Sequence, residues 1–181
     1  MASTLAIAQT FDLNIDQFRA AFDAQSKKES AWPDAVATIK TVTKAGPKTY
    51  KVTLNDAVFV RMVKTWKELD LANGKFTLKD RLEIGVGADQ KLDRITISSS
   101  RADMNLFHFL STMATTARVL DPGISKDQLQ DIVNELGLMK GDAAKGIGSP
   151  KDTFTKGAVI TCLQFPSVVS LDIACAFTPR S

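Results

Sequence analysis

Polar and apolar side chains alternate in the stretch KTYKVTL, which occupies residues 48–54. Its apolar members are Tyr50, Val52 and Leu54, and a threonine or a lysine precedes each of them. Successive side chains of a β-strand point to opposite faces of the sheet. The pattern therefore predicts a strand that buries one face and exposes the other.

Strands are predicted on both sides of this stretch. Val36–Thr43 is rich in β-branched residues, and the turn residues 44–47 join it to residues 48–54 in a β-hairpin. Further along, Arg81–Val86 and Lys91–Ser98 flank a turn and form a second predicted pair. Together these runs indicate an antiparallel meander.

The run Ala57–Lys64 fits two structures. Its helical stripe consists of Phe59, Met62, Trp66 and Leu69. The β-branched residues that favour a strand are Val58, Val60 and Val63. Because the neighbouring runs are strands, we predict a strand here as well.

Three helices are predicted. Asn14 and Gln17 are placed to form a capping box at the start of the first, and Ser125 and Gln128 repeat that arrangement at the start of the last. Between them, Ser100–Leu120 is apolar around most of its circumference, which is typical of a buried helix. Strands and helices in separate groups predict an α+β fold, with helices packed on one face of an antiparallel sheet.

The first and last helices begin with similar sequences, NIDQF at residues 14–18 and SKDQL at residues 125–129. A loop and a predicted hairpin follow each of them. Two interpretations are open: two αββ-like units, or one fold with two good N-caps. A length of 181 residues suits a single domain. We place it at residues 11–181, after a flexible N-terminus at residues 1–10.

The two cysteines, Cys162 and Cys175, fall in the β-rich runs Ala158–Phe165 and Val168–Phe177. A hairpin with its turn near Val168 places them opposite each other, within reach of a disulfide. Their spacing fits neither a zinc half-site nor a dithiol redox motif. We therefore favour a disulfide and an oxidising compartment; the alternative is a pair of buried free thiols.

The first residues contain Ala6-Ile7-Ala8, which has the form of a secretory cleavage site. A complete signal peptide also needs a basic region and an apolar run of about 7–15 residues, and both are missing. The stretch is either the remnant of a signal peptide, with Gln9 opening the mature chain, or a cytosolic N-terminus rich in small residues. Together with the cysteines it favours a periplasmic or secreted protein over a cytoplasmic one.

Composition excludes several classes of protein. With 44% hydrophobic and 24% charged residues, the chain is too balanced for intrinsic disorder. No apolar run approaches the ~18 residues that a transmembrane segment needs. The net charge of +3 does not by itself imply a nucleic-acid partner.

His108 is the only histidine, so we predict no metal site with two histidine ligands. A hydrolase could combine it with Asp103 and a serine, either Ser111 or one of Ser98–Ser100, but no nucleophile-elbow motif is present. A hydrogen-bonded structural histidine is the favoured interpretation. The glycines near residues 85–87 and 141–148 lack phosphate-loop and dinucleotide-binding patterns, and no cofactor is predicted.

Basic residues concentrate between Val36 and Lys67, where seven of them accompany the single acid Asp56, a local net charge of +6. The candidate binding residues of this basic face are Lys40, Lys44, Lys48, Lys51, Lys64 and Trp66. An anionic lipid, a glycan or an acidic protein would suit such a face. Nucleic acid is the weakest option, because no arginine cluster or RNP-like aromatic pair is present. Protection of an exposed sheet from aggregation is the favoured interpretation.

The sequence thus favours a non-enzymatic exported α+β domain that binds a protein or an amphiphile through its sheet or a helix–sheet groove. Two alternatives stay open. One is a hydrolase that uses His108. The other is a cytosolic or capsid-like interaction protein whose basic Val36–Lys67 face binds an anionic partner.

Overall fold

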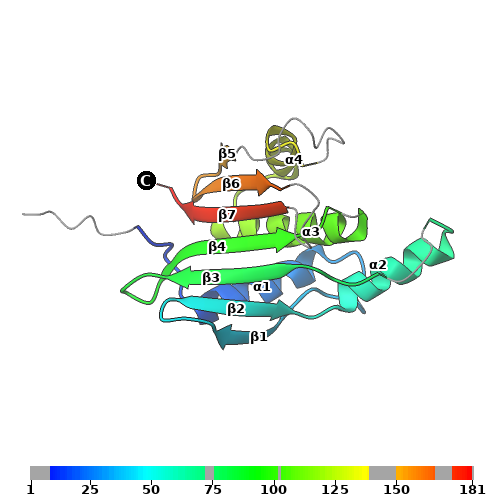
Figure 1. Ribbon diagram of the computed structural model, residues 1–181, viewed down its shortest axis with the longest axis horizontal. Helices are drawn as coiled ribbons and strands as arrows, with labels where there is room; N and C mark the ends of the chain where they lie inside the picture. Colours follow the sequence, from blue (N-terminus) through cyan, green and yellow to red (C-terminus); the bar gives the residue numbers. More distant parts are fainter. Residues whose placement is uncertain (1–8, 72–75, 102, 139–149, 166–172, 181) are drawn as a thin grey trace, which may run out of the picture.

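The computed structural model describes residues 9–71, 76–101, 103–138, 150–165 and 173–180. These residues form the predicted α+β fold, with four helices and one seven-stranded sheet (Figure 1). In chain order the elements are α1 (Ile15–Glu29), β1 (Ile39–Lys44), β2 (Thr49–Leu54), α2 (Ala57–Glu68), β3 (Arg81–Val86), β4 (Leu92–Ser99), α3 (Asp103–Leu120), α4 (Lys126–Glu135), β5 (Lys151–Phe154), β6 (Ala158–Gln164) and β7 (Ile173–Pro179).

Neighbouring strands of the sheet are antiparallel, in the spatial order β1-β2-β3-β4-β7-β6-β5. The predicted pairs β1–β2 and β3–β4 are confirmed. Alternate residues face the helices, and in β3 these are Leu82, Ile84 and Val86, all buried. In Figure 1, α1 and α3 lie behind the sheet, and no helix of the described ranges crosses its near face. The core is therefore one layer between sheet and helices.

The predicted capping boxes hold the starts of α1 and α4. The Asn14 side chain accepts a hydrogen bond from the Gln17 backbone at 2.9 Å, and the Gln17 side chain accepts one from the Asn14 backbone. Ser125 and Gln128 form the same reciprocal pair. Each box satisfies two backbone donors that a helix end otherwise leaves without partners, so local sequence alone can place these starts.

The prediction of a strand at residues 57–64 is wrong, because Ala57–Glu68 forms helix α2. In the sheet, β2 already pairs with β1 on one side and β3 on the other, which leaves no edge of β2 for a further strand. The helical pattern of apolar residues is the one that the fold uses, because it buries Phe59 and Met62 against the rest of the molecule. Figure 1 shows α2 projecting beyond the end of the strands.

Strand β5 has no counterpart among the predicted strands. Its four residues pair with β6, from Lys151 opposite Cys162 to Phe154 opposite Val159. Several other predictions fall outside the described residues. They concern Ala6-Ile7-Ala8, the glycines at 141–148 and the turn near Val168.

The cysteines lie opposite each other, as predicted. Cys162 on β6 and Cys175 on β7 are register partners in the antiparallel pair, with Cα atoms 4.1 Å apart. Both side chains are buried on the face of the sheet that meets the helices. The pair is at disulfide distance and joins two neighbouring strands of the core.

Candidate functional site

Four of the predicted basic residues gather on the β1–β2 hairpin. Lys40 and Lys44 belong to β1, Lys48 to the turn and Lys51 to β2, and all four are exposed. Among the described residues, none of the four is in an ion pair. Since β1 is an edge strand, this lysine hairpin places positive charge along one edge of the sheet.

Lys64 and Trp66 are not part of the lysine hairpin. Both belong to α2, which follows the end of β2 that is farther from the hairpin turn (Figure 1). Lys64 lies 3.8 Å from Glu68, one helical turn along. Trp66 packs edge-on against Phe107 of α3, with ring centroids 5.5 Å apart. The structure therefore divides the six residues of the predicted face between two places.

His108 lies in a buried polar cluster with Asp80 and Ser99. An ionised carboxylate only accepts hydrogen bonds, so His108 Nδ1 donates to Asp80 Oδ2. The Ser99 hydroxyl donates to the other oxygen, Oδ1. The side chains of His108 and Asp80 are only 1% and 4% exposed. The histidine is hydrogen-bonded, as favoured above, but to a carboxylate that the sequence analysis did not single out.

The remaining ring nitrogen, His108 Nε2, has no hydrogen-bond partner in the described part of the chain. The Phe59 ring stands edge-on to the imidazole, with centroids 6.1 Å apart. In a Ser-His-Asp hydrolase this nitrogen takes the proton of the nucleophilic serine. Here the serine of the cluster is bonded to the carboxylate instead.

A second residue of α3, Asn105, extends this contact between α3 and the segment before β3. Its side chain accepts from the Lys79 backbone at 2.8 Å and donates to the Thr77 carbonyl at 3.2 Å. The segment at residues 77–80 is not paired with a strand. The bonds to Asn105 therefore satisfy backbone groups that strand pairing would otherwise satisfy. The polar cluster therefore braces this segment against α3.

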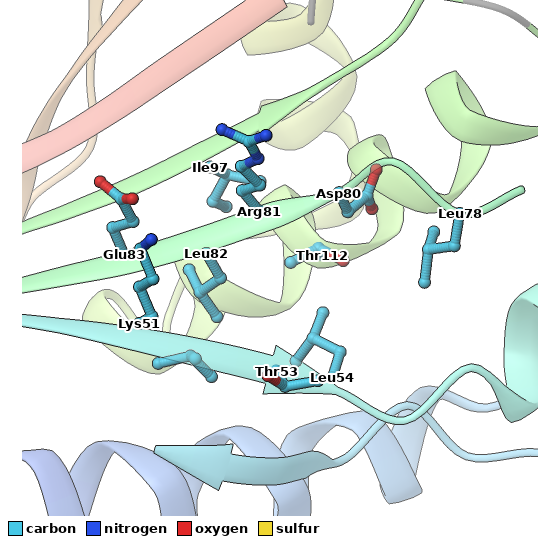
Figure 2. A pocket seen from close by; sticks show the side chains of 11 residues that line it. Lys51, Thr53, Leu54, Leu78, Asp80, Arg81, Leu82, Glu83, Ile97 and Thr112 are labelled. Atoms are coloured by element: carbon cyan, nitrogen blue, oxygen red, sulfur yellow. The ribbon is translucent and has the colours of Figure 1, made fainter. Parts of the chain in front are cut away.

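A cavity of about 450 Å³ opens where β2 and β3 separate (Figure 2). Their pairing ends at Val52 and Leu82. Beyond that point Figure 2 shows Thr53 and Leu54 on one side of the opening, with Thr112 of α3 beneath it. The cavity is thus a gap in the sheet that reaches down to the helix layer.

Four charged side chains line this gap, namely Lys51, Asp80, Arg81 and Glu83. Lys51 and Glu83 are register partners on β2 and β3, and Figure 2 shows their ends on the same side of the sheet. Asp80 is already bonded to Ser99 and His108. The Asp80 carboxylate is therefore engaged by hydrogen bonds inside the protein.

A different cavity, of about 410 Å³, lies between α1, α2 and α3, and we call it the helical groove. Its wall on α2 consists of Val58, Met62 and Trp66. Its wall on α3 consists of Phe107, Ser111, Ala114 and Thr115. Its third wall, at the end of α1 and in the loop that follows, consists of Ser26, Glu29, Ser30, Ala31, Trp32 and Ala37. The spacing of three and four residues on each helix turns these side chains toward one space.

The aromatic side chains of the groove are held by specific contacts. Trp66 and Phe107 meet at an interplanar angle of 70°, the edge-to-face geometry that aromatic pairs prefer. In the loop, the Ser30 hydroxyl accepts from the Trp32 backbone at 3.1 Å and donates to the Trp32 carbonyl at 2.8 Å. The walls are therefore preformed.

The lining of the groove carries no uncompensated charge among its described residues. Glu29 is its only ionisable member. Arg118 lies 2.6 Å from Glu29 Oε2, and the Gln25 side chain donates to Oε1. The remaining polar side-chain groups are hydroxyls and the indole N–H groups of Trp32 and Trp66, all of them neutral. Electrostatically, the groove is neutral.

In the ranges that the structure describes, no group of three or more His, Cys, Asp or Glu side chains is arranged to hold a metal ion. None of the helices described there is long and apolar enough to cross a membrane. Comparison with protein-family models, with curated proteins and with solved structures finds no match for this chain. A function therefore has to follow from the residues and their geometry.

The helical groove was not predicted from the sequence. Its signal was present in α2, where Val58, Met62 and Trp66 recur every four residues, but the prediction of a strand concealed that spacing. A second signal was Ser26, a polar residue four positions after the apolar Phe22. Only a correct helix for residues 57–68 brings these side chains together.

Proposed function

We propose that this protein is a non-enzymatic binding domain that takes an apolar small molecule into the helical groove. The observation that carries the proposal is the groove itself, a neutral cavity of about 410 Å³ lined by Trp32, Trp66 and Phe107. Ligand sites are typically concave spaces of about 300–1,000 Å³, lined by apolar and aromatic side chains with a few polar groups. The helical groove fits this description in size and lining.

The exposure of Phe107 supports the same function. This ring is 45% exposed although it belongs to α3, whose other large apolar side chains are buried or half-buried. Water contact with a large apolar surface is unfavourable, and an apolar ligand in the groove would remove part of it. The Trp66 ring packs against Phe107, so this apolar surface is already ordered before a ligand binds.

We also propose an oxidising compartment, either the periplasm or the extracellular space. The supporting observation is the buried pair of Cys162 and Cys175 at disulfide distance on neighbouring strands. Disulfides form and persist in such compartments and are rare in the cytosol.

The two alternative functions receive less support. For a hydrolase, substrate would have to reach His108, whose side chain is buried and whose Nε2 faces no serine of the described ranges. For an anionic partner, the lysine hairpin offers charge, but Trp66, the aromatic residue predicted to accompany it, lies in the helical groove. Both alternatives stay predictions.

Binding of diphenylhexatriene, a neutral hydrocarbon dye that fluoresces in apolar surroundings, tests the proposal. We expect saturable binding of one dye per chain. Ser111 is exposed on α3 and lines the groove, so Ser111→Trp should obstruct the groove without disturbing the core. This change should weaken dye binding by at least about tenfold.

The matched control is Val60→Trp. Val60 is 57% exposed on α2 and lies outside the groove lining, so the added ring should leave dye affinity unchanged. Absence of saturable binding, or equal binding by the Ser111→Trp protein, would overturn the proposal.

A further inference from the structure

Ser26 occupies a position where the fold calls for an apolar side chain. It follows Phe18 and Phe22 at intervals of four residues on the buried face of α1. Its side chain is only 6% exposed, and its Oγ atom has no hydrogen-bond partner among the described residues. A buried hydroxyl without a partner destabilises the folded state, so an alanine here would give a more stable protein.

The same side chain lines the helical groove. A hydroxyl can both donate and accept a hydrogen bond, so Ser26 brings unused hydrogen-bonding capacity to the wall of the groove. Ser30, in the same lining, is different, because its hydroxyl is already bonded to the backbone of Trp32 and Ala35. Departures from local rules of stability are expected where a site serves a function.

The charge of the lining restricts which ligands can use this hydroxyl. Both carboxylate oxygens of Glu29 are occupied, by Arg118 and by Gln25. No lysine or arginine belongs to the described lining. A charged group brought to Ser26 would lose water without gaining a counter-charge, which is strongly unfavourable. A neutral group with one donor or acceptor would lose little hydration free energy and would gain a hydrogen bond.

We propose that the ligand of the helical groove is a neutral amphiphile, an apolar body that ends in a hydroxyl or carbonyl group, and that Ser26 binds this polar end. The inference rests on the proposed function and names its ligand class. The apolar body lies against Trp66 and Phe107, while the polar end satisfies the Ser26 hydroxyl.

Displacement of diphenylhexatriene by three probes with the same ten-carbon chain tests the ligand class. The probes are 1-decanol, decanoate and decyltrimethylammonium, at neutral pH and below the concentrations at which they form micelles. We expect decanol to displace the dye at a concentration at least about tenfold lower than either charged probe. Equal or better displacement by a charged probe would overturn the inference.

The substitution Ser26→Ala tests the role of the hydroxyl. The affinity for decanol should fall about 2- to 10-fold, as expected for the loss of one neutral hydrogen bond. The affinity for diphenylhexatriene, which has no polar atom, should not change. The melting temperature of the ligand-free protein should rise by a few degrees, because the unsatisfied hydroxyl is gone. A residue with a purely structural role would not lower decanol affinity while raising stability.

The matched control is Thr43→Ala, which removes an exposed hydroxyl on β1, outside the groove lining, and should leave decanol affinity unchanged. An unchanged decanol affinity in the Ser26→Ala protein would overturn the role of Ser26. These outcomes are distinct from failure of the proposed function. If the wild-type protein binds no diphenylhexatriene, the groove is not a binding site; if it binds the dye but does not prefer decanol, only the ligand class is wrong.

Discussion

Asp80 and His108 are bonded to each other in the interior, although 28 positions separate them in the chain. Asp80 belongs to the segment before β3 and His108 to α3, so the contact fastens an irregular segment to a buried helix. Ser99, at the end of β4, donates a hydrogen bond to the other oxygen of the Asp80 carboxylate. Asp80 also lines the cavity in Figure 2, where β2 and β3 separate.

We expect Asp80→Ala to destabilise the protein by about 1–3 kcal/mol, because it leaves the buried imidazole of His108 and the Ser99 hydroxyl without their hydrogen-bond partner. Urea denaturation of the variant and the wild type measures this difference. Replacing both partners with apolar residues, in Asp80→Leu with His108→Phe, should cost less than Asp80→Ala alone. A loss below about 1 kcal/mol in the single variant would show that the pair is not a brace.

Cys162 and Cys175 should be oxidised in protein made in an oxidising compartment. Intact-mass analysis without reductant should show the loss of two hydrogens relative to the reduced chain. The two residues are 13 positions apart, and closing a loop of that length stabilises a protein by about 3 kcal/mol in the chain-entropy model. Cys162→Ala with Cys175→Ala should lower the free energy of unfolding by up to that amount. Two free, alkylatable thiols in this preparation would contradict both expectations.

Gly157 has no room for a side chain. A Cβ atom there would lie 2.5 Å from the backbone oxygen of Leu120, at the end of α3. Backbone cannot move aside cheaply, so Gly157→Ala should destabilise the protein by about 1–3 kcal/mol. Gly46→Ala is the control, because the nearest atom to its Cβ would be 3.8 Å away. Similar melting temperatures for the two variants would disprove the close approach.

The lysine hairpin predicts retention on an anionic matrix. Charge reversal at Lys44, Lys48 and Lys51 to glutamate should elute the protein from heparin at a lower salt concentration, because unpaired exposed lysines supply the attraction.

Reversal of three exposed lysines elsewhere, Lys28, Lys79 and Lys126, changes the net charge equally and controls for it. If both triple variants elute together, the hairpin has no special affinity and its lysines serve only to protect the edge of the sheet.

Asp12 and Lys91 form an exposed ion pair that shifts the titration of both groups. The hydrogen bond and charge of Lys91 hold the pKa of Asp12 below its ordinary value of 3.8, and Asp12 in turn raises the pKa of Lys91 above 10.5. A lowered carboxyl pKa gives stability that is present above pH 3.8 and is lost as the pH falls through the folded-state value. Lys91→Met should return the pKa of Asp12 toward 3.8 in an NMR titration. No change in that pKa would show that the pair is not formed in solution.

Much of the fold was predictable from patterns confined to a few residues. The alternation of Tyr50, Val52 and Leu54 predicted β2 because side chains of a strand alternate between two faces. The capping boxes at Asn14 and Ser125 predicted helix starts because their hydrogen bonds span only three residues. These patterns do not depend on which residues pack against them from other parts of the sequence.

Other elements depend on neighbours that are distant in the sequence. Residues 57–68 have both helical and strand patterns. Both edges of β2 are paired with other strands, so these residues form a helix and not a further strand beside β2. The four-residue strand β5 exists because β6 offers it an edge, and its own sequence shows no strong alternation. Local propensity is weak in such cases, and tertiary contacts override it.

The candidate site divides in the same way. The α+β class, the facing cysteines and the lysines of the β1–β2 hairpin were predictable locally, because each follows from the period of a strand or a helix. The pairing of Asp80 with His108, and the groove lined by Ser26, Trp66 and Phe107, depend on how distant elements pack. These residues come from different elements, and the helix and sheet packing that sets their distances is absent from any local pattern.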